Sequence, residues 1–444
     1  MAREMKDSGV EWIGKCPASW KFLKGKYIFV LRNDRGNTIE LQLLSPTQKF
    51  GVIPQSLFEE LTTNTTVKVK ENTDLSQFKT IHKGDFCISL RSFQGGFEYC
   101  FYEGVVSPAY QVFYPITKIC DNYYKYLFKD QSFISKMNSY TLSLRDGKNI
   151  AFADFGSTYL PIPPLSEQEK ISSFLDEKCS EIDSLASDIE KQISVLENYK
   201  KSIITETVTK GLNPNVEMKD SGVEWIGKIP SNWNKARLKD LCSFGKGLSI
   251  TKADLCQDGE PVISYGQIHS KTNISTSIKE DLIRFVPSKK CEFCKVSLCS
   301  VGDFIFADTS EDKDGCGNFI YVDRKNVFAG YHTIILKSLI TPTKFLSYLF
   351  QSDDWRYQIR LSANGIKVFS ITQKILSSTT VVLPPLREQV EITNYLDKKC
   401  SEIDSLISEK KEQLKKLASY KQSMIYEYVT GKKEVPTQEI AQCF

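Results

Sequence analysis

Two segments of this chain occur twice, and the repeat constrains its architecture more than any other feature. The eleven residues MKDSGVEWIGK stand at 5–15 and return unchanged at 218–228. The segment PPLSEQEKISSFLDEKCSEIDSL at 163–185 returns as PPLREQVEITNYLDKKCSEIDSL at 384–406. The first pair is offset by 213 residues and the second by 221, so the sequence between them is 8 residues longer in the second half. One scaffold used twice predicts two similar units related by a pseudo-two-fold axis.

Two dissimilar bodies lie between the repeated ends, at 22–162 and 234–383. They share only traces, such as the GDF that stands at 84–86 and 302–304. Short apolar runs, Gly-rich turns and a few helical stretches predict a mixed α/β domain for each body. The expected strands are FCISL at 86–90, VFYPI at 112–116, FIFA at 304–307 and TIILK at 333–337, and the expected amphipathic helices are 123–137 and 345–359.

Each closing segment has the pattern of a long helix. Pro163 and Pro164 end the preceding extended run, and Ser166 and Glu169 have the spacing of a capping box. Apolar residues then follow a seven-residue repeat over four to five heptads, which is typical of a coiled coil. A helix of about 42 residues would be roughly 63 Å long. We expect the two helices to pair antiparallel along a seam of Leu175, Ile182, Leu185, Ile189, Leu196, Tyr199, Leu396, Ile403, Leu406, Leu417 and Tyr420.

The whole chain is therefore predicted to be α+β, with two bodies joined by two long antiparallel coiled-coil helices. The alternative is that each helix packs only on its own body. The predicted segments are an N-terminal segment at 1–21, a first body at 22–162, a central helix at 163–211, a linker and repeat at 212–233, a second body at 234–383, a C-terminal helix at 384–432 and a tail at 433–444.

Charge is distributed unevenly along the chain. The net charge is +4, with +3 in the first body, +5 in the second and −4 in the remainder. Two mildly basic bodies permit a polyanionic partner. No apolar run approaches the roughly 20 residues that span a bilayer, and the N-terminus lacks the apolar stretch of a signal peptide, so we expect a cytoplasmic protein with its 13 cysteines reduced.

Motifs for catalysis or cofactor binding are missing from the sequence. The chain has three histidines and no G-x-x-x-x-G-K-[ST] phosphate loop. It also lacks the glycine-rich loop and the Asn/Asp-Pro-Pro-aromatic motif of amino-methyltransferases. Cys291 and Cys294 form a single C-x-x-C, and zinc would require a second close pair, so thiols without metal are the favoured interpretation. Two other classes stay open, which are a coiled-coil adaptor for proteins and a self-contained DNA enzyme with unrecognised motifs.

Several turns of the two bodies carry side chains suited to reading DNA. Arg, Lys, Asn and Gln can form paired hydrogen bonds with guanine or adenine edges, and others nearby can hold phosphates. For any one of these residues, an ordinary solvated turn is the competing interpretation. The candidates are Arg91, Gln94, Tyr110, Arg145, Lys148 and Asn149 in the first body and Thr309, Ser310, Lys313, Tyr331, Asn364 and Lys367 in the second.

These features together resemble the specificity (S) subunit of type I restriction-modification systems. The resemblance covers the whole chain and rests on MKDSGVEWIGK-x-P-x-x-W before each body, on PPLxEQ leading into LDxKCSEIDSL after it, and on 90–110, which looks like part of a target recognition domain. Arg387, in place of the serine of the first copy, departs from the pattern and puts only that helix cap in doubt.

The resemblance implies a non-catalytic subunit that binds double-stranded DNA. Each body would be a target recognition domain that reads one half of a bipartite, asymmetric site, and the helices would fix the unread spacer. They would also help to dock two methyltransferase (M) subunits, which bind S-adenosylmethionine and methylate adenine. Restriction (R) subunits, which hydrolyse ATP with Mg and cleave DNA, would join that core. No cofactor is expected in this chain itself.

Overall fold

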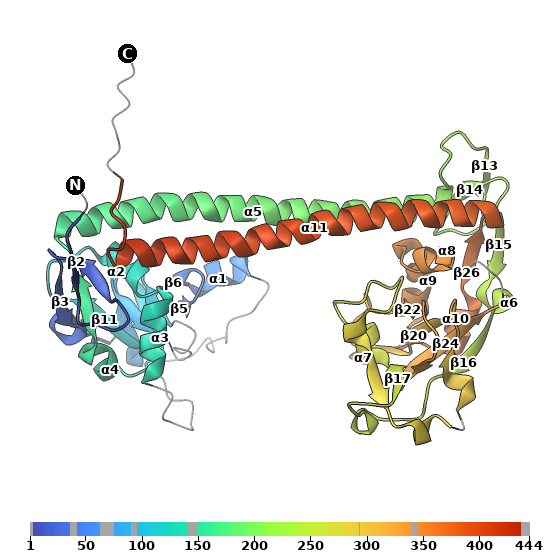
Figure 1. The fold of residues 1–444 in the computed structure, drawn as a ribbon, viewed down its shortest axis with the longest axis horizontal. Coiled ribbons are helices and arrows are strands. Elements are labelled where there is room, and N and C mark those ends of the chain that lie inside the picture. The colour runs from blue at the N-terminus through green and yellow to red at the C-terminus, as the bar shows by residue number, and fades with distance from the viewer. Residues whose placement is uncertain are drawn as a thin grey trace, which may run out of the picture. The chain divides into compact units, whose positions relative to one another are not determined.

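The computed structural model describes residues 3–35, 42–62, 75–89, 96–140, 150–292, 294–339 and 344–436 (Figure 1). These residues form two compact units. The first unit comprises residues 1–189 with 412–444, and the second comprises 190–411. Helix α5 (Leu165–Lys210) and helix α11 (Leu386–Val429) each contribute one part to the first unit and one part to the second. The two expected long helices are therefore confirmed, with 46 and 44 residues.

The beginning of each long helix differs from the predicted cap. The predicted capping box is wrong, because α5 begins at Leu165 and Ser166 lies inside its first turn. Gln168 instead donates from Nε2 to the carbonyl oxygen of Pro163 at 2.8 Å. Gln389, its equivalent in α11, donates to the carbonyl oxygen of Pro384 at the same distance. The glutamine of PPLxEQ thus ties each helix to the strand before it.

Each long helix ends at a glycine. Gly211 and Gly431 have φ values of +78° and +73°, in the left-handed region where glycine is favoured. The amide of Gly211 donates to the carbonyl oxygen of Thr207 at 3.0 Å, which closes the last turn of α5.

The body of the first unit is built on a four-stranded sheet in the order β4-β11-β8-β9. A strand pair of β3 and β12 connects this body to α5, and β1 and β2 form a separate hairpin. The elements are β1 (Met5–Asp7), β2 (Lys15–Pro17), β3 (Lys21–Lys24), β4 (Phe29–Leu31), β5 (Leu44–Thr47), β6 (Gly51–Pro54), α1 (Gln55–Leu61), β7 (Lys79–Ile81), β8 (Phe86–Ile88), β9 (Phe97–Tyr99), β10 (Gly104–Val106), β11 (Gln111–Pro115), α2 (Asp121–Leu127), α3 (Gln131–Ser139), α4 (Phe152–Ser157) and β12 (Tyr159–Ile162).

The body of the second unit repeats this plan with the sheet order β16-β24-β20-β22. A second sheet has the order β18-β17-β23-β19, and β21 pairs with β25. The elements are β13 (Met218–Asp220), β14 (Lys228–Pro230), β15 (Asn234–Arg237), α6 (Leu238–Leu241), β16 (Cys242–Lys246), β17 (Glu260–Ile263), α7 (Tyr265–Ile268), β18 (Arg284–Val286), β19 (Leu298–Cys299), β20 (Phe304–Ala307), β21 (Thr309–Ser310), β22 (Phe319–Tyr321), β23 (Val327–Ala329), β24 (Thr333–Ser338), α8 (Lys344–Leu349), α9 (Asp353–Ser362), β25 (Phe369–Ser370), α10 (Gln373–Ser378) and β26 (Thr380–Leu383).

The GDF that both bodies share forms the same turn in each. Gly84 and Gly302 have positive φ, and the following Asp85 and Asp303 are buried. Each aspartate accepts a hydrogen bond from the backbone amide three residues before it, at 2.9 Å for Asp85 and 2.8 Å for Asp303. The motif is therefore a structural turn that leads into β8 and β20.

The helical stretch of each body is divided where the sequence predicted one helix. In the first body α2 ends at Leu127, and Asp130 caps α3 by accepting from the amides of Ser132 and Phe133 at 2.9 and 3.1 Å. In the second body Ser352 caps α9 in the same position. A capping side chain in the middle of an apolar periodic run ends one helix and starts the next.

The core of each unit contains the start of one long helix and the end of the other. In the first unit Leu175 of α5 shares an aromatic-rich cluster with Val429 of α11. In the second unit Leu396 of α11 shares a cluster with Val208 of α5. Trp20 and Trp233, from the two copies of the repeated N-terminal segment, are both fully buried there. Each body is thus closed by helical segments from both halves of the sequence.

Candidate nucleic-acid interface

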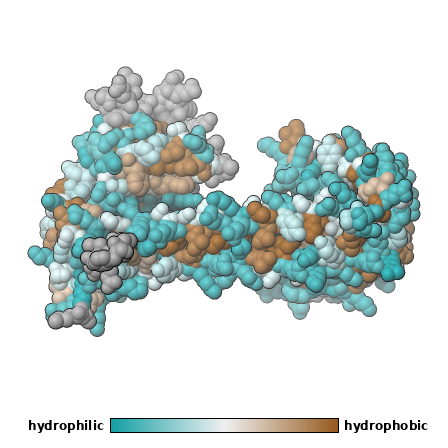
Figure 2. All heavy atoms as spheres, turned by 90° about the horizontal axis from the view of Figure 1, so that it is seen from above, coloured by the Kyte–Doolittle hydropathy of each residue, from teal (hydrophilic) through white to brown (hydrophobic). Residues whose placement is uncertain are grey.

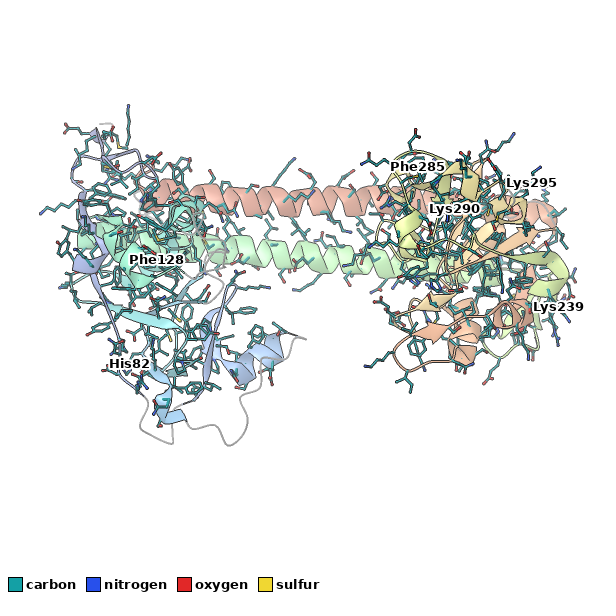
Figure 3. The ribbon with its side chains drawn as sticks, turned by 90° about the horizontal axis from the view of Figure 1, so that it is seen from below. His82, Phe128, Lys239, Phe285, Lys290 and Lys295 are labelled. Atoms are coloured by element: carbon teal, nitrogen blue, oxygen red, sulfur yellow. The ribbon has the colours of Figure 1, made fainter. Side chains whose placement is uncertain are left out.

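The predicted seam residues fall on two lines along the helices, and the helices pack along the first of these lines. Leu175, Ile189, Leu396 and Ile403 are buried, and Ile182, Leu196 and Leu417 are partly buried. Side chains along the helices point both between them and outward (Figure 3).

The other predicted line lies outside the seam. Its side chains are about half exposed or more. They are Leu185 (51%), Tyr199 (53%), Leu406 (46%) and Tyr420 (60%). The inner positions four residues after the first line are held instead by Cys179, Ile193, Cys400, Ile407 and Tyr428, all buried. In a seven-residue repeat, a second line of apolar residues can lie on either side of the first line along a helix. The line predicted from the sequence contains Leu185 and Tyr199, and this line faces outward.

Lysine–aspartate pairs fix the register of the helices within each unit. Lys421 donates to Asp183 at 2.6 Å in the first unit, and Lys200 donates to Asp404 at 2.7 Å in the second. The two pairs are equivalent under the 221-residue offset of the repeat. This reciprocity is what an antiparallel pairing of two copies of one helix requires.

Most of the candidate reading residues in the first body lie outside the described residues. They are Arg91, Gln94, Arg145, Lys148 and Asn149. Tyr110 is described, and its partly buried ring packs on a small apolar cluster that includes Val52 and Val112. Its carbonyl oxygen accepts a hydrogen bond from Nζ of Lys79 at 2.7 Å. Tyr110 therefore belongs partly to the packing of this body.

The second body has a cleft of about 750 Å³ that two of the candidates line. Thr309 and Tyr331 lie on its wall with Lys246, His332 and Lys374. The ring of Tyr331 meets Tyr265 edge-on at 5.6 Å, which holds the aromatic ring in place. The cleft thus combines aromatic, hydroxyl and cationic side chains.

The remaining candidates of the second body gather on the ribbon of β21 and β25. Thr309 pairs with Ser370, and Asn364 makes an isolated bridge to the same Ser370. Nζ of Lys313 lies 5.9 Å from the ring centre of Phe369 on this ribbon. Ser310 is buried and is placed for packing. Lys367 is exposed in the turn that follows Asn364.

A hydrogen-bonded chain that the sequence did not reveal supports this ribbon. His269 Nε2 lies 2.8 Å from the carbonyl oxygen of Thr309, and Asn318 Nδ2 lies 3.0 Å from His269 Nδ1. Arg356 in turn donates to Oδ1 of Asn318. Burial and the neighbouring Arg360 lower the pKa of Arg356 to about 10. The chain joins three separate segments, at His269, at 309–318 and at Arg356, so no local pattern could indicate it.

A larger cavity of about 1150 Å³ lies within the second unit between α9 and the local segments of α5 and α11. Seven cationic side chains line it, against four carboxylates. Three of those carboxylates are neutralised by cations of the same cavity. The ion pairs are Asp404–Lys200, Asp353–Arg360 and Glu197–Lys411. The cavity can therefore accept an anion with several charges. Its cationic residues are Lys200, Lys201, Lys271, Lys279, Arg356, Arg360 and Lys411.

Comparison with known families decides which class of protein carries these features. The family described as the type I restriction modification DNA specificity domain matches twice, at residues 18–195 and 230–416. Each match covers one body and most of the helix after it. The chain belongs to this type I specificity-domain family.

Curated members of the type I specificity family are distant relatives in sequence. The MjaVIII specificity subunit of Methanocaldococcus jannaschii is 25% identical over 306 residues, or 66% of this chain and 67% of that subunit. The putative MjaX specificity subunit of the same organism is 28% identical and matches over 63% and 60%. The EcoKI specificity subunit of Escherichia coli K12 is 23% identical, over 64% and 59%. The chain thus matches about three fifths to two thirds of each relative's length.

Solved structures share the fold of this specificity-domain chain. A chain from work on complex assembly and conformational transition of the type I R-M system has a TM-score of 0.69 at 16% identity, covering 94% of this chain and 99% of that one. The HsdS subunit of Thermoanaerobacter tengcongensis has a TM-score of 0.51 at 15% identity, covering 94% and 98%.

The described residues form neither a metal-ligand cluster nor a membrane-spanning helix. Among them, no three His, Cys, Asp or Glu side chains are grouped as a metal site, and Cys291 is buried next to a partly buried Cys294. None of the helices in the described ranges is both long and apolar enough to cross a membrane.

Proposed function

We propose that this chain is the DNA sequence-specificity subunit of a type I restriction-modification complex. Each body would read one half of a bipartite site, and because the bodies differ in sequence the two half-sites would differ. The observation that carries the proposal is the repeated framework, in which the sheets β4-β11-β8-β9 and β16-β24-β20-β22 share one strand order while the turns they present differ. Family membership supports the same proposal.

The basic cavity of the second unit is the proposed place for the DNA backbone. Phosphate contacts from Lys and Arg supply most of the affinity and set the register, while base contacts specify the sequence. Lys201, Lys271 and Lys279 line the cavity and make no ion pair with another described residue. The cleft of Thr309 and Tyr331 and the ribbon at Asn364 would then face base edges.

The outward face of the helices is the proposed docking surface for methyltransferase subunits. In the first unit it carries Leu185 and Tyr420, within two residues of the Asp183–Lys421 pair. In the second unit the equivalent residues are Tyr199 and Leu406. Figure 2 shows apolar residues along this helix pair. Equivalent exposed surfaces in the two units fit two copies of one partner.

Catalysis is assigned to the partner subunits in this proposal. The chain would bind no cofactor, methyltransferase subunits would bind S-adenosylmethionine, and restriction subunits would use ATP and Mg. A cytoplasmic location goes with this assignment, because the complex acts on cellular DNA. Turnover of S-adenosylmethionine by the isolated chain would favour a self-contained DNA enzyme instead.

A mobility-shift assay of the chain with and without methyltransferase subunits tests the proposal. We expect one bipartite sequence, identified by long-read methylation mapping, to be bound far more tightly than shuffled DNA. Proteins of this kind commonly bind their specific DNA site about 10³- to 10⁷-fold more tightly than non-specific DNA. A reconstituted complex without any sequence preference would favour a coiled-coil adaptor for proteins.

Exchange of a body tests the assignment of half-sites. Replacing residues 22–162 with another family member's body should change one half-site and leave the other unaltered in the methylation map. The matched exchange of 234–383 should change only the opposite half-site. A change in both half-sites after either exchange would contradict independent reading.

The length of the helices is proposed to set the spacer. One heptad inserted after Lys191 and another after Glu412 would keep both lysine–aspartate pairs in register, since each insertion lies midway between the two pairs along its helix. Seven residues lengthen a helix by about 10.5 Å, or roughly 3 base pairs of DNA. The methylation map should show a longer spacer with unchanged half-sites, and an unchanged spacer would oppose the proposal.

A further inference from the structure

Ile366 is the most exposed of the large apolar side chains in the part of the chain that the structure describes. It is 94% exposed, in the turn that joins Asn364 to strand β25. Val368 in the same turn and Leu361 at the end of α9 are also exposed. Covering an isoleucine that is almost entirely exposed to water lowers the free energy of the system. This turn therefore presents an apolar tip at the surface.

The turn that carries Ile366 is held in place by the backbone. Gly365 has a φ of +150°, and a Cβ added there would lie 2.0 Å from the carbonyl oxygen of Val368, so only glycine fits. The amide of Ser370 donates to the carbonyl oxygen of Asn364 at 2.9 Å, closing the loop. Phe369 packs against the core of the second unit. Ile366 thus stands on a short, anchored hairpin.

The neighbours of Ile366 narrow the chemistry of its partner. Asn364, which is exposed, is the side chain that pairs with the N6 and N7 edge of adenine. Lys367, the residue after Ile366, is also exposed, and Lys313 lies over Phe369 of the same ribbon. Lysines suit a polyanionic backbone, and an amide next to an apolar side chain suits a surface that presents both polar and apolar groups. DNA has a backbone of the first kind and base edges of the second kind. The major groove of DNA has one such apolar group, the C5 methyl of thymine.

We infer that Ile366 packs on the methyl group of a thymine in the half-site read by the second body, beside an adenine contacted by Asn364. The inference rests on the proposed function and adds which bases of the half-site the second body contacts. The turn would then select an A·T pair, because cytosine in place of thymine lacks the methyl group. A wedge that inserts between base pairs is the other way an apolar side chain engages DNA.

Deoxyuridine, which lacks only the methyl group of thymine, tests the inference. The complex of the full chain with methyltransferase subunits would be titrated with duplexes in which each thymine of that half-site is replaced singly by deoxyuridine. We expect one position to weaken binding about fourfold, the ratio associated with one buried methyl group. The variant Ile366→Ala should bind the thymine duplex several-fold more weakly and lose that deoxyuridine sensitivity.

Matched variants separate reading from general binding. Lys367→Ala should weaken binding to all duplexes and keep the deoxyuridine sensitivity. Leu339→Ala, which truncates an exposed leucine directly after β24, should leave both unchanged. Unchanged thermal unfolding of Ile366→Ala would show that the exposed substitution leaves the fold intact.

Several outcomes would overturn the inference. They are a half-site without thymine, no sensitive position, or a sensitivity that persists in Ile366→Ala. Increased 2-aminopurine fluorescence that depends on Ile366 without any effect of deoxyuridine would indicate a wedge. A complex that shows no sequence preference would defeat the proposed function as well, whereas specific binding without methyl dependence would defeat this inference alone.

Discussion

Lys200 donates to both carboxylate oxygens of Asp404 at 2.7 Å and so joins α5 to α11 in the second unit. The repeat supplies the same bond in the first unit, where Lys421 donates to Asp183. Both bonds link the two halves of the sequence. The same lysine and aspartate positions of the repeat therefore link the two helices once in each unit, and each link defines the antiparallel register.

Exchanging the charges of Lys200 and Asp404 tests whether this ion pair sets the register of the two helices. Lys200→Asp or Asp404→Lys alone should lower the free energy of unfolding by about 0.5–1 kcal/mol, because each places like charges side by side at a partly exposed site. The double exchange should restore most of the loss. Urea unfolding of the four proteins measures the coupling, and additive losses would show that the pair does not set the register.

Truncation of leucines on the two faces of α11 should give very different results. Leu396 is fully buried, and Leu396→Ala should cost about 2–5 kcal/mol. Leu406 is 46% exposed, and Leu406→Ala should stay within about 1 kcal/mol in the isolated chain. If Leu406 contacts a methyltransferase subunit, its truncation should weaken assembly, measured by analytical ultracentrifugation. Equal destabilisation by both changes would contradict the observed seam.

Two glycines with similar φ should respond differently to alanine. Gly431 has φ +73°, and an added Cβ would meet Pro17 at 2.4 Å, whereas Gly9 has φ +67° with nothing within 4 Å. Gly9→Ala should cost only the strain of the left-handed conformation, about 1–2 kcal/mol. Gly431→Ala should cost clearly more, because α11 must shift from the repeated N-terminal segment. Equal losses in thermal unfolding would show that this contact yields easily.

The buried Glu98 should make stability depend on pH. Burial raises its pKa from 4.5 to about 7, even though Lys129 donates to it at 2.7 and 2.8 Å. The folded state binds this proton more tightly than the unfolded state, so the stabilisation is full below about pH 4.5 and is lost as the pH rises through about 7. The loss is on the order of 1–3 kcal/mol.

The variant Glu98→Gln isolates this contribution, because it cannot release a proton. Its free energy of unfolding should fall less than that of the unaltered chain between pH 4.5 and 8, as measured by urea unfolding at each pH. Parallel curves for the two proteins would contradict a raised pKa.

The sequence alone determined the repeat, the two long helices and the mixed α/β bodies. The repeated segments carry the same local patterns in both halves, and a seven-residue period is local information that a helix expresses directly. The first seam line, which includes Leu175 and Leu396, and the strands β8, β11, β20 and β24 followed from the same local patterns.

Tertiary structure alone decided which side of a periodic helix is covered and which turns meet. Leu185 and Tyr199 have the spacing of seam residues, yet the position of the other helix leaves them exposed. The contact of His269 with Thr309 joins residues 40 positions apart. The pairing of Thr309 with Ser370 brings residues from distant segments together in the same way. Such contacts arise from packing between distant segments, and no periodicity or spacing within one segment encodes them.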